Sequence, residues 1–125
     1  MITITRKLEA DIGHRVYGHE GKCARLHGHR FVFEVKVTAD DFDSIGRVID
    51  YSVIKELCGK WIDENWDHRT LLYFQDPLCS RISEKDGKVE VKFNPTSENI
   101  CDHLLEVFGN LLTHTSVSLV GVRVY

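Results

Sequence analysis

The sequence predicts an α+β domain: an antiparallel sheet with two helices packed on one face, in the order β-β-α-(hairpin)-α-β. Three observations support this fold class. Two long alternating segments open the chain, two later segments repeat apolar residues at helical spacing, and a last alternating segment ends it. Strands in hairpins with the helices grouped on one side are typical of an α+β layout. At this length, we expect residues 1–125 to form a single domain with one core.

The first two strands are expected over residues 2–14 and from Leu26 to Thr38. In the second strand the odd positions share one face, because side chains alternate along a strand. That face carries two histidines and then an apolar stripe: His27, His29, Phe31, Phe33, Val35 and Val37. A stripe that ends in histidines suits a sheet face covered by helices, with a site at its rim.

The first helix is expected from about Ser52 to Glu64, after an acidic turn over residues 40–46. Ser52 or Asp50 is suited to be its N-cap. The positions that recur at helical spacing are Ile54, Leu57, Cys58, Trp61 and Ile62. These residues predict one apolar face that packs on the sheet.

The second half of the chain predicts a hairpin, a helix and a strand. Residues 73–93 are expected to form the hairpin, since Asp86-Gly87 marks a turn and apolar residues alternate with charged ones after it. The helix begins at Thr96 or Ser97, either of which suits an N-cap, and an acid follows in its first turn. Residues 116–125 alternate again and are expected to form the last strand.

The composition excludes several classes of function. The formal net charge of −3 argues against nucleic acid as the main partner, because such binding rests on phosphate neutralisation. No apolar run approaches the roughly 20 residues of a membrane span, and the N-terminus lacks the layout of a signal peptide. The cysteines form no Cys-x-x-Cys pair, so we expect reduced thiols in a cytoplasmic protein: Cys23, Cys58, Cys79 and Cys101.

The most informative motif is His27-Gly28-His29. Histidines at i and i+2 on a strand point from the same face, about 7 Å apart, close enough to share one ion. The glycine between them leaves the opposite face open to another backbone or a ligand. Zinc is the natural ion for an all-imidazole site, and a catalytic zinc keeps three protein ligands and an open position. The third ligand is expected from the neighbouring strand, which His14 ends. The weaker candidates are His19, His103 and His114.

Cys23 lies four residues before His27, so a potential nucleophile or base accompanies the metal site. Two other interpretations stay open at this point. Cys23 joins the histidines in a closed, non-catalytic structural zinc-binding module, since Cys-His-His-His is an acceptable shell. Alternatively, Cys23, His68 and Asp67 form a metal-free thiol hydrolase. That interpretation does not explain why His27 and His29 share a strand face.

Four blocks of the sequence carry a resemblance to a known family. They are Ala10–Val16 with its His-Arg pair, Gly21–His29 with Cys-x-x-x-His-Gly-His, Gly46–Lys55, and Asp67-His68 with Asn94–Glu98 downstream. The chain resembles the 6-pyruvoyltetrahydropterin synthase and 6-carboxytetrahydropterin synthase family over nearly its whole length. All four blocks occur in the family's order, which makes chance similarity hard to sustain.

The resemblance implies a fold and a set of site residues. The fold is the tunnelling fold (T-fold), and the zinc ligands are His14, His27 and His29. Cys23 is implied as the catalytic base, and Asp67 and His68 as a hydrogen-bonded pair on the opposite side of the substrate. The candidates for binding the substrate are Thr96 and Glu98, although an acid in the first turn of a helix also has a structural reason to be there.

Within the family, the run Gly46-Arg47-Val48-Ile49-Asp50-Tyr51 resembles the bacterial type. The resemblance implies a lyase that converts 7,8-dihydroneopterin triphosphate to 6-carboxytetrahydropterin, losing acetaldehyde and triphosphate, on the route to queuosine. The sister activity keeps the three-carbon side chain and gives 6-pyruvoyltetrahydropterin. The implied assembly is a homohexamer of two stacked trimers, with active sites at the subunit boundaries.

Two features depart from the family pattern. Family members usually carry a Glu-Thr pair just after the last strand, where the glutamate binds the pterin edge. In this chain the last residue is Tyr125, one position short of the expected pair. The segment over residues 73–92 is also longer than the bacterial type needs.

Overall fold

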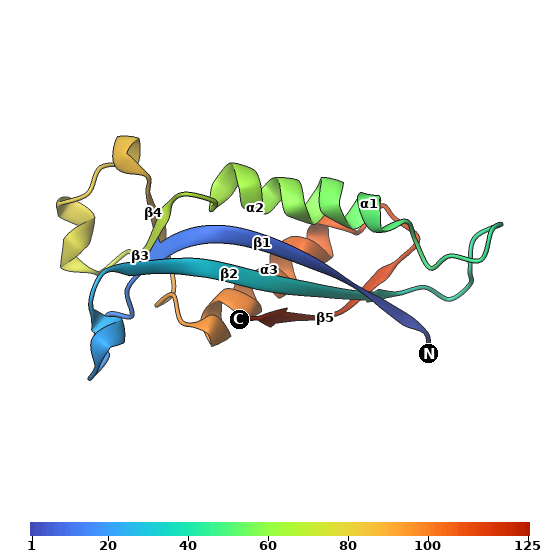
Figure 1. Ribbon diagram of the computed structural model, residues 1–125, viewed down its shortest axis with the longest axis horizontal. Coiled ribbons are helices and arrows are strands. Elements are labelled where there is room, and N and C mark those ends of the chain that lie inside the picture. The colour runs from blue at the N-terminus through green and yellow to red at the C-terminus, as the bar shows by residue number, and fades with distance from the viewer.

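The computed structural model describes all 125 residues and contains one five-stranded mixed sheet (Figure 1). The strand order is β4-β3-β1-β2-β5. The pairs β1–β2 and β2–β5 are antiparallel, whereas β1–β3 and β3–β4 are parallel. The strands are β1 (Thr3–His14), β2 (His27–Thr38), β3 (Thr70–Tyr73), β4 (Lys88–Val91) and β5 (Ser118–Val124).

The two long strands β1 and β2 pair along their whole length and form the centre of the sheet (Figure 1). Thr3 lies opposite Thr38 at one end, and His14 lies opposite His27 at the other. The predicted parity of β2 is confirmed, because its four apolar odd positions are fully buried: Phe31, Phe33, Val35 and Val37. His27 and His29 therefore continue the face of β2 that carries these buried residues.

Two helical segments cover this buried face of the sheet. The first runs without a break through α1 (Tyr51–Ile54), a π-helical turn η2 (Lys55–Gly59) and α2 (Lys60–Asn65). The second is α3 (Ser97–Leu111). One of the two predicted caps is confirmed at each helix start, since the carboxylate of Asp50 accepts from Ser52 N and the hydroxyl of Thr96 accepts from Asn99 N. The alternatives Ser52 and Ser97 lie within the helices. Neither segment is long and apolar enough to cross a membrane.

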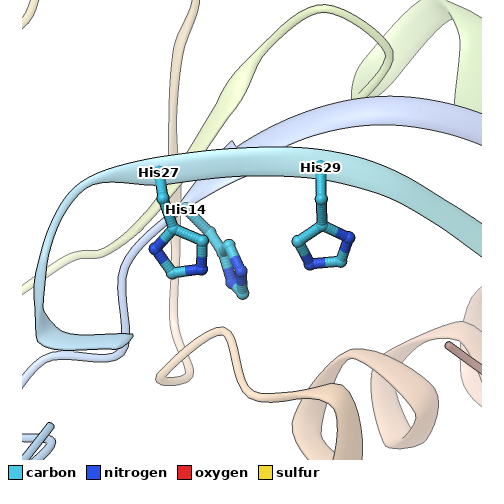
Figure 2. Close-up of side chains that lie close together, drawn as sticks. All are labelled: His14, His27 and His29. Carbon is cyan, nitrogen blue, oxygen red and sulfur yellow. The ribbon is translucent and has the colours of Figure 1, made fainter. Parts of the chain in front are cut away.

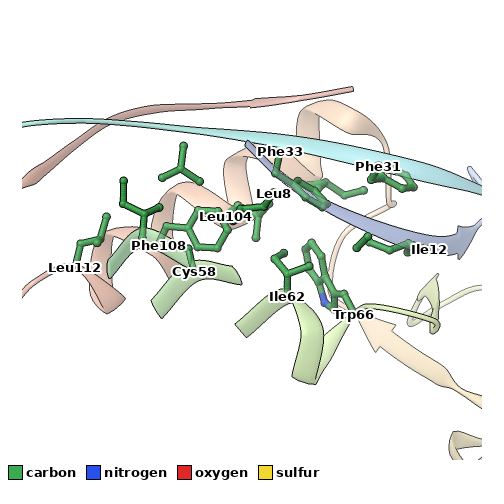
Figure 3. Packing of buried hydrophobic residues seen from close by; sticks show 14 of the residues in the cluster. Leu8, Ile12, Phe31, Phe33, Cys58, Ile62, Trp66, Leu104, Phe108 and Leu112 are labelled. Carbon is green, nitrogen blue, oxygen red and sulfur yellow. The ribbon is translucent and has the colours of Figure 1, made fainter. Parts of the chain in front are cut away.

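The core lies between the sheet and these helices (Figure 3). Leu8 and Ile12 of β1 pack with the β2 stripe against residues of both helical segments. The helical contributions include Ile54, Cys58, Ile62, Leu104 and Phe108, each 0–1% exposed. The α+β class with both helices on one face is thus confirmed, and the sheet is mixed rather than antiparallel.

The predicted hairpin over residues 73–93 is wrong. The turn and the strand after it exist, since Gly87 has a φ of +96° and β4 follows directly. Residues 74–87 hold no strand, however, and instead form two 3-10 turns, η3 (Pro77–Ser80) and η4 (Glu84–Asp86). This segment returns the chain to the start of β3, so β4 pairs with β3 in the parallel direction.

Three strand edges have no partner within the chain. Strand β3 pairs with β1 only at Gly13 and His14, so the rest of β1 is unpaired on that side. Strands β4 and β5 end the sheet, since β4 pairs only with β3 and β5 only with β2. The long β1 edge and the outer edges of β4 and β5 therefore present unpaired backbone groups.

Candidate active site

The β1–β2 pairing brings three histidines together at one end of the sheet (Figure 2). His14 lies across the ladder from His27, and His29 follows two residues later on the same face. Their potential ligand atoms all lie within 4.8 Å of one another. In Figure 2 the three side chains extend from the same face of the strands and point toward the segment that leads into α3. This three-histidine group is the arrangement predicted from the sequence.

The orientation of each imidazole is set by a backbone carbonyl. In all three rings Nδ1 lies within hydrogen-bond distance of such an oxygen, which fixes Nδ1 as the donor and leaves Nε2 with a free lone pair. The bonds are His14 to Pro95 O at 2.9 Å, His27 to Arg25 O at 2.7 Å and His29 to Arg30 O at 3.1 Å. Three convergent Nε2 atoms form the donor set of a metal site.

His14 is the deepest of the three, with 6% of its surface exposed. Its Nε2 is buried and has no hydrogen-bond partner. Burial lowers the pKa of His14, the Pro95 hydrogen bond raises it, and the neighbouring His27 and His29 lower it further, with a net downward shift. A buried neutral imidazole with an unpaired lone pair is costly to keep unless something binds it. The residues present therefore fit a bound metal ion.

Close backbone packing explains the glycine between the two histidines. Gly28 lies opposite Gly13 in the ladder, and a Cβ at Gly28 would come within 3.3 Å of Ile12 O. A Cβ at Gly13 would come within 2.8 Å of the Thr70 Oγ1 atom of β3. Gly28 thus lets β2 approach β1, and Gly13 lets β3 approach β1, at the rim that carries the histidines.

Cys23 lies in the 3-10 turn η1 (Lys22–Ala24), on the loop between β1 and β2. The loop is closed by a hydrogen bond from Val16 N to Cys23 O at 2.8 Å. Cys23 is the exposed member of the four free cysteines. Burial raises the pKa of Cys58 to about 12, and it also raises the pKa values of Cys79 and Cys101. Cys23 is not part of the three-histidine group.

Asp67 and His68 form the predicted pair, with His68 Nδ1 3.0 Å from Asp67 Oδ2. The other carboxylate oxygen accepts from Asp11 N at 2.9 Å. Burial alone would raise the pKa of Asp67, but the hydrogen bond from Asp11 and the neighbouring His68 hold it below its usual value. His68 has a left-handed φ of +59°, a conformation that non-glycine residues rarely adopt.

The pair is not part of the three-histidine group. The His68 side chain is 77% exposed. It lines a cavity of about 400 Å³ with Asp11 and Arg30, whose side chains alternate with the buried ones of β1 and β2; His29 also contributes to the lining. The His68 side chain therefore lies on the face of the sheet opposite the helices.

The remaining candidates fall into two groups. Thr96 caps α3 directly after Pro95, the partner of His14, and Glu98 is exposed in the first turn of the same helix. The other histidines lie outside the site: His19 accepts from Gly21 N in its own loop, His103 packs against Trp66, and His114 follows α3.

Sequence reasoning missed two partners of the site. One is the Pro95 carbonyl, because the segment before α3 was interpreted as a helix start and a family block with substrate-binding candidates, not as a partner of His14. The other is Asp76, whose carboxylate is buried and bonds to Arg15, the residue after His14. The hydrogen bond from Arg15 holds the pKa of Asp76 below its usual value, against the effect of burial. Arg15 and Asp76 are 61 positions apart in the sequence, and His14 and Pro95 are 81 positions apart, so no spacing pattern links either pair.

The fold and the site together define a class of protein: an α+β protein with a candidate metal centre of three histidines. Residues 3–125 match the family model described as 6-pyruvoyl tetrahydropterin synthase. The chain belongs to the 6-pyruvoyl tetrahydropterin synthase family.

Curated relatives match the chain over its full length. A 6-carboxy-5,6,7,8-tetrahydropterin synthase from Rickettsia felis is 40% identical over 129 residues, which covers 100% of this chain and 94% of the relative. A protein of the same name from Haemophilus influenzae is 28% identical over 133 residues, covering 100% of this chain and 92% of the relative.

Solved structures share the fold. An uncharacterised protein from Wolinella succinogenes superposes with a TM-score of 0.85 at 23% identity, covering 99% of this chain and 92% of its own. The 6-pyruvoyl tetrahydropterin synthase of Caenorhabditis elegans superposes with a TM-score of 0.66 at 20% identity, covering 99% and 94%. The T-fold implied by the sequence resemblance is thus confirmed.

Proposed function

We propose that this enzyme is a 6-carboxy-5,6,7,8-tetrahydropterin synthase, which converts 7,8-dihydroneopterin triphosphate to 6-carboxytetrahydropterin with loss of acetaldehyde and triphosphate. The observation that carries the proposal is the full-length match, at 40% identity, to a relative of that name. The same product would place the enzyme in the synthesis of queuosine and related deazaguanine nucleosides.

Zinc is the metal that we assign to the three-histidine group. Neutral imidazoles suit zinc, and three protein ligands leave a position open for substrate, as in catalytic zinc sites. The separation of Cys23 from the group supports this open centre over the closed Cys-His-His-His shell. When bound, zinc supplies Lewis-acid polarisation of the side-chain hydroxyls of the substrate. His14, His27 and His29 would hold it through Nε2.

Cys23 is assigned as the base that removes a proton from the substrate side chain. A thiolate is a competent base near neutral pH, whereas a buried thiol of high pKa is not. Cys23 is the exposed cysteine, and it lies on the loop that leads from one metal ligand to the next. These features support the assignment over the other three cysteines.

Asp67 and His68 are assigned as an acid–base pair. The carboxylate fixes the imidazole tautomer and stabilises the imidazolium, as in other Asp–His pairs. Because His68 is exposed on the sheet face away from the helices, we assign its reactive nitrogen Nε2 to a pocket that a neighbouring subunit completes. Thr96 and Glu98, at the start of α3, are assigned to substrate binding.

The free strand edges support self-association, and the family resemblance supports a homohexamer built from two trimers. Unpaired edges are commonly covered or paired with other subunits, and pairing β5 of one chain with β1 of the next would cover both of these edges. Exposed apolar side chains near the start of β1 also favour burial against another chain: Ile2, Phe42 and Tyr51.

Product analysis tests the proposal. The protein is incubated with 7,8-dihydroneopterin triphosphate, the pterin product is identified by mass spectrometry, and acetaldehyde is assayed. We expect 6-carboxytetrahydropterin and one equivalent of acetaldehyde. A 6-pyruvoyl product without acetaldehyde would instead assign the sister activity. Zinc-loaded protein that yields neither product would favour the non-catalytic module.

A further inference from the structure

Asn94 joins two segments that lie far apart in the sequence, the loop after β1 and the start of α3. Tyr17 N donates to Asn94 Oδ1 at 3.0 Å, and Asn94 Nδ2 donates to Tyr17 O at 2.8 Å. One carboxamide thus satisfies both backbone groups of one residue. Asparagine suits this task because its side chain carries an acceptor and a donor side by side.

The backbone of Asn94 is itself held at the helix start. Its carbonyl accepts from Thr96 N at 2.7 Å and from the Asn99 side chain at 3.0 Å. The proline that follows restricts Asn94 to extended conformations. The next carbonyl, that of Pro95, accepts the Nδ1 hydrogen bond of His14. The position of Asn94 therefore fixes the oxygen that orients the most buried metal ligand.

The other end of the connection reaches the thiol-bearing loop. Tyr17 follows Val16, whose N–H donates to Cys23 O and closes the loop. Residues 16–24 contain one short 3-10 turn and contribute no residue to the buried core, so few other contacts hold them in place. The Asn94 side chain is thus a direct link between the Cys23 loop and the partner of His14.

We propose that Asn94 is a positioning residue for the active site. Its side chain holds the Cys23 loop, and its backbone holds the Pro95 carbonyl, so that both stay in one geometry relative to His14 Nε2. The consequence for turnover rests on the proposed function. The consequences for zinc affinity and for loop order do not depend on the identity of the substrate.

The test compares Asn94→Ala with Asn110→Ala, which removes an exposed asparagine at the other end of α3. Zinc affinity is measured by competition with a chromophoric chelator, and loop order by amide hydrogen exchange of residues 16–24. N94A removes the side-chain hydrogen bonds to Tyr17 and leaves the Asn94 carbonyl in place, so it loosens the Pro95 carbonyl only indirectly. We therefore expect zinc affinity in N94A to fall by no more than about 10-fold, the low end for loss of an outer-shell contact. Exchange in the loop, including the Tyr17 amide, is expected to accelerate. N110A should change neither quantity.

Two further variants keep the test decisive. Val117→Ala removes a buried contact at the far end of the sheet, and it shows the zinc affinity of a protein that is merely less stable. Asn94→Asp keeps the acceptor for Tyr17 N and loses the donor, so it replaces N94A in both measurements if N94A does not fold. We expect a smaller loss of zinc affinity in N94D than in N94A.

The proposal is overturned if zinc affinity or loop exchange in N94A stays within twofold of the unchanged protein. It is also overturned if V117A loses as much zinc affinity as N94A, because the effect would then be one of stability. Failure to convert dihydroneopterin triphosphate would refute the proposed function alone, since neither measurement uses that substrate.

Discussion

At the scale of single residues, the direction of each Nδ1–H decides what the three histidines do. Each Nδ1–H donates a hydrogen bond to a backbone carbonyl, so each ring presents Nε2 to the same space. His14 contributes most to this arrangement, because its Nε2 is buried without a partner and its pKa is lowered by burial. A neutral ring of this kind is ready to bind a cation without first losing a proton.

Replacing His14 with Ala is expected to strip most of the zinc from the protein, since removal of one of three ligands weakens a site severely. The measurement is elemental analysis after dialysis against a weak chelator. His114→Ala is the matched control, because that residue lies after α3 and outside the site. An H14A protein that keeps one zinc per chain would show that the third ligand is elsewhere.

Replacing Cys23 with Ser should have the opposite consequence for metal. We expect C23S to keep its zinc and to lose at least about 100-fold in kcat, because a hydroxyl is a far weaker base than a thiolate at neutral pH. In the unchanged protein, iodoacetamide should modify Cys23 before the buried Cys58. Loss of zinc from C23S would support the closed structural shell instead.

The three-histidine group was predictable because its geometry is local. Strand parity placed His27 and His29 on one face, and the hairpin-like return of the chain placed His14 across from them. The supporting partners were not predictable, since Pro95 and Asp76 approach from 81 and 61 residues away. The contact between Asp67 and His68 was predicted. The face of the sheet on which the pair lies was not, because it depends on where β3 pairs with β1.

At the scale of elements, the segment between β3 and β4 connects the sheet to the site. Asp76 caps the 3-10 turn η3 through Leu78 N and pairs with Arg15 at the end of β1. The carboxylate is fully buried, whereas the Arg15 side chain is 21% exposed. This contact gives the long segment a structural role: it anchors the residue next to His14.

Asp76→Asn is expected to lower the free energy of unfolding at pH 7 by about 3 kcal/mol, because it leaves a largely buried guanidinium without its counter-charge. The pKa of Asp76 is lowered in the folded protein, so its stabilisation is present above the ordinary carboxyl pKa and is lost as pH falls through the lowered value. The difference between the two proteins should therefore shrink between about pH 5 and pH 3.

Urea unfolding of metal-free protein at several pH values makes this comparison, with Asp102→Asn on the exposed face of α3 as the control. A D76N protein as stable as the unchanged one at pH 7 would remove the anchoring role. A difference that stays constant down to pH 3 would assign the loss to packing rather than to charge.

Most elements were predictable, and the exception has a clear cause. The alternation of residues 88–91 correctly predicted a strand, and Gly87 correctly marked the turn before it. Alternation carries no information about which strand lies alongside, however. The two 3-10 turns over residues 77–86 lack a periodic pattern, so the parallel return to β3 left no signal in the sequence.

At the scale of the whole molecule, the free edges of β1 and β5 can pair with other chains. Size-exclusion chromatography with light scattering at micromolar concentration is expected to give six times the 14.4 kDa chain mass. The expectation of self-association rests on these edges, and the number six rests on the family resemblance. A fully active monomer would contradict the assignment of His68 to a shared pocket.

The central claim is that a zinc centre of three histidines drives the cleavage of a pterin side chain. Its most direct test is a zinc titration of chelator-treated protein in the presence of 7,8-dihydroneopterin triphosphate. We expect no acetaldehyde without metal, and a rate of release that rises with zinc and reaches its plateau at one ion per chain. Full-rate release from metal-free protein, or no acetaldehyde from protein that holds one zinc ion per chain, would contradict the claim.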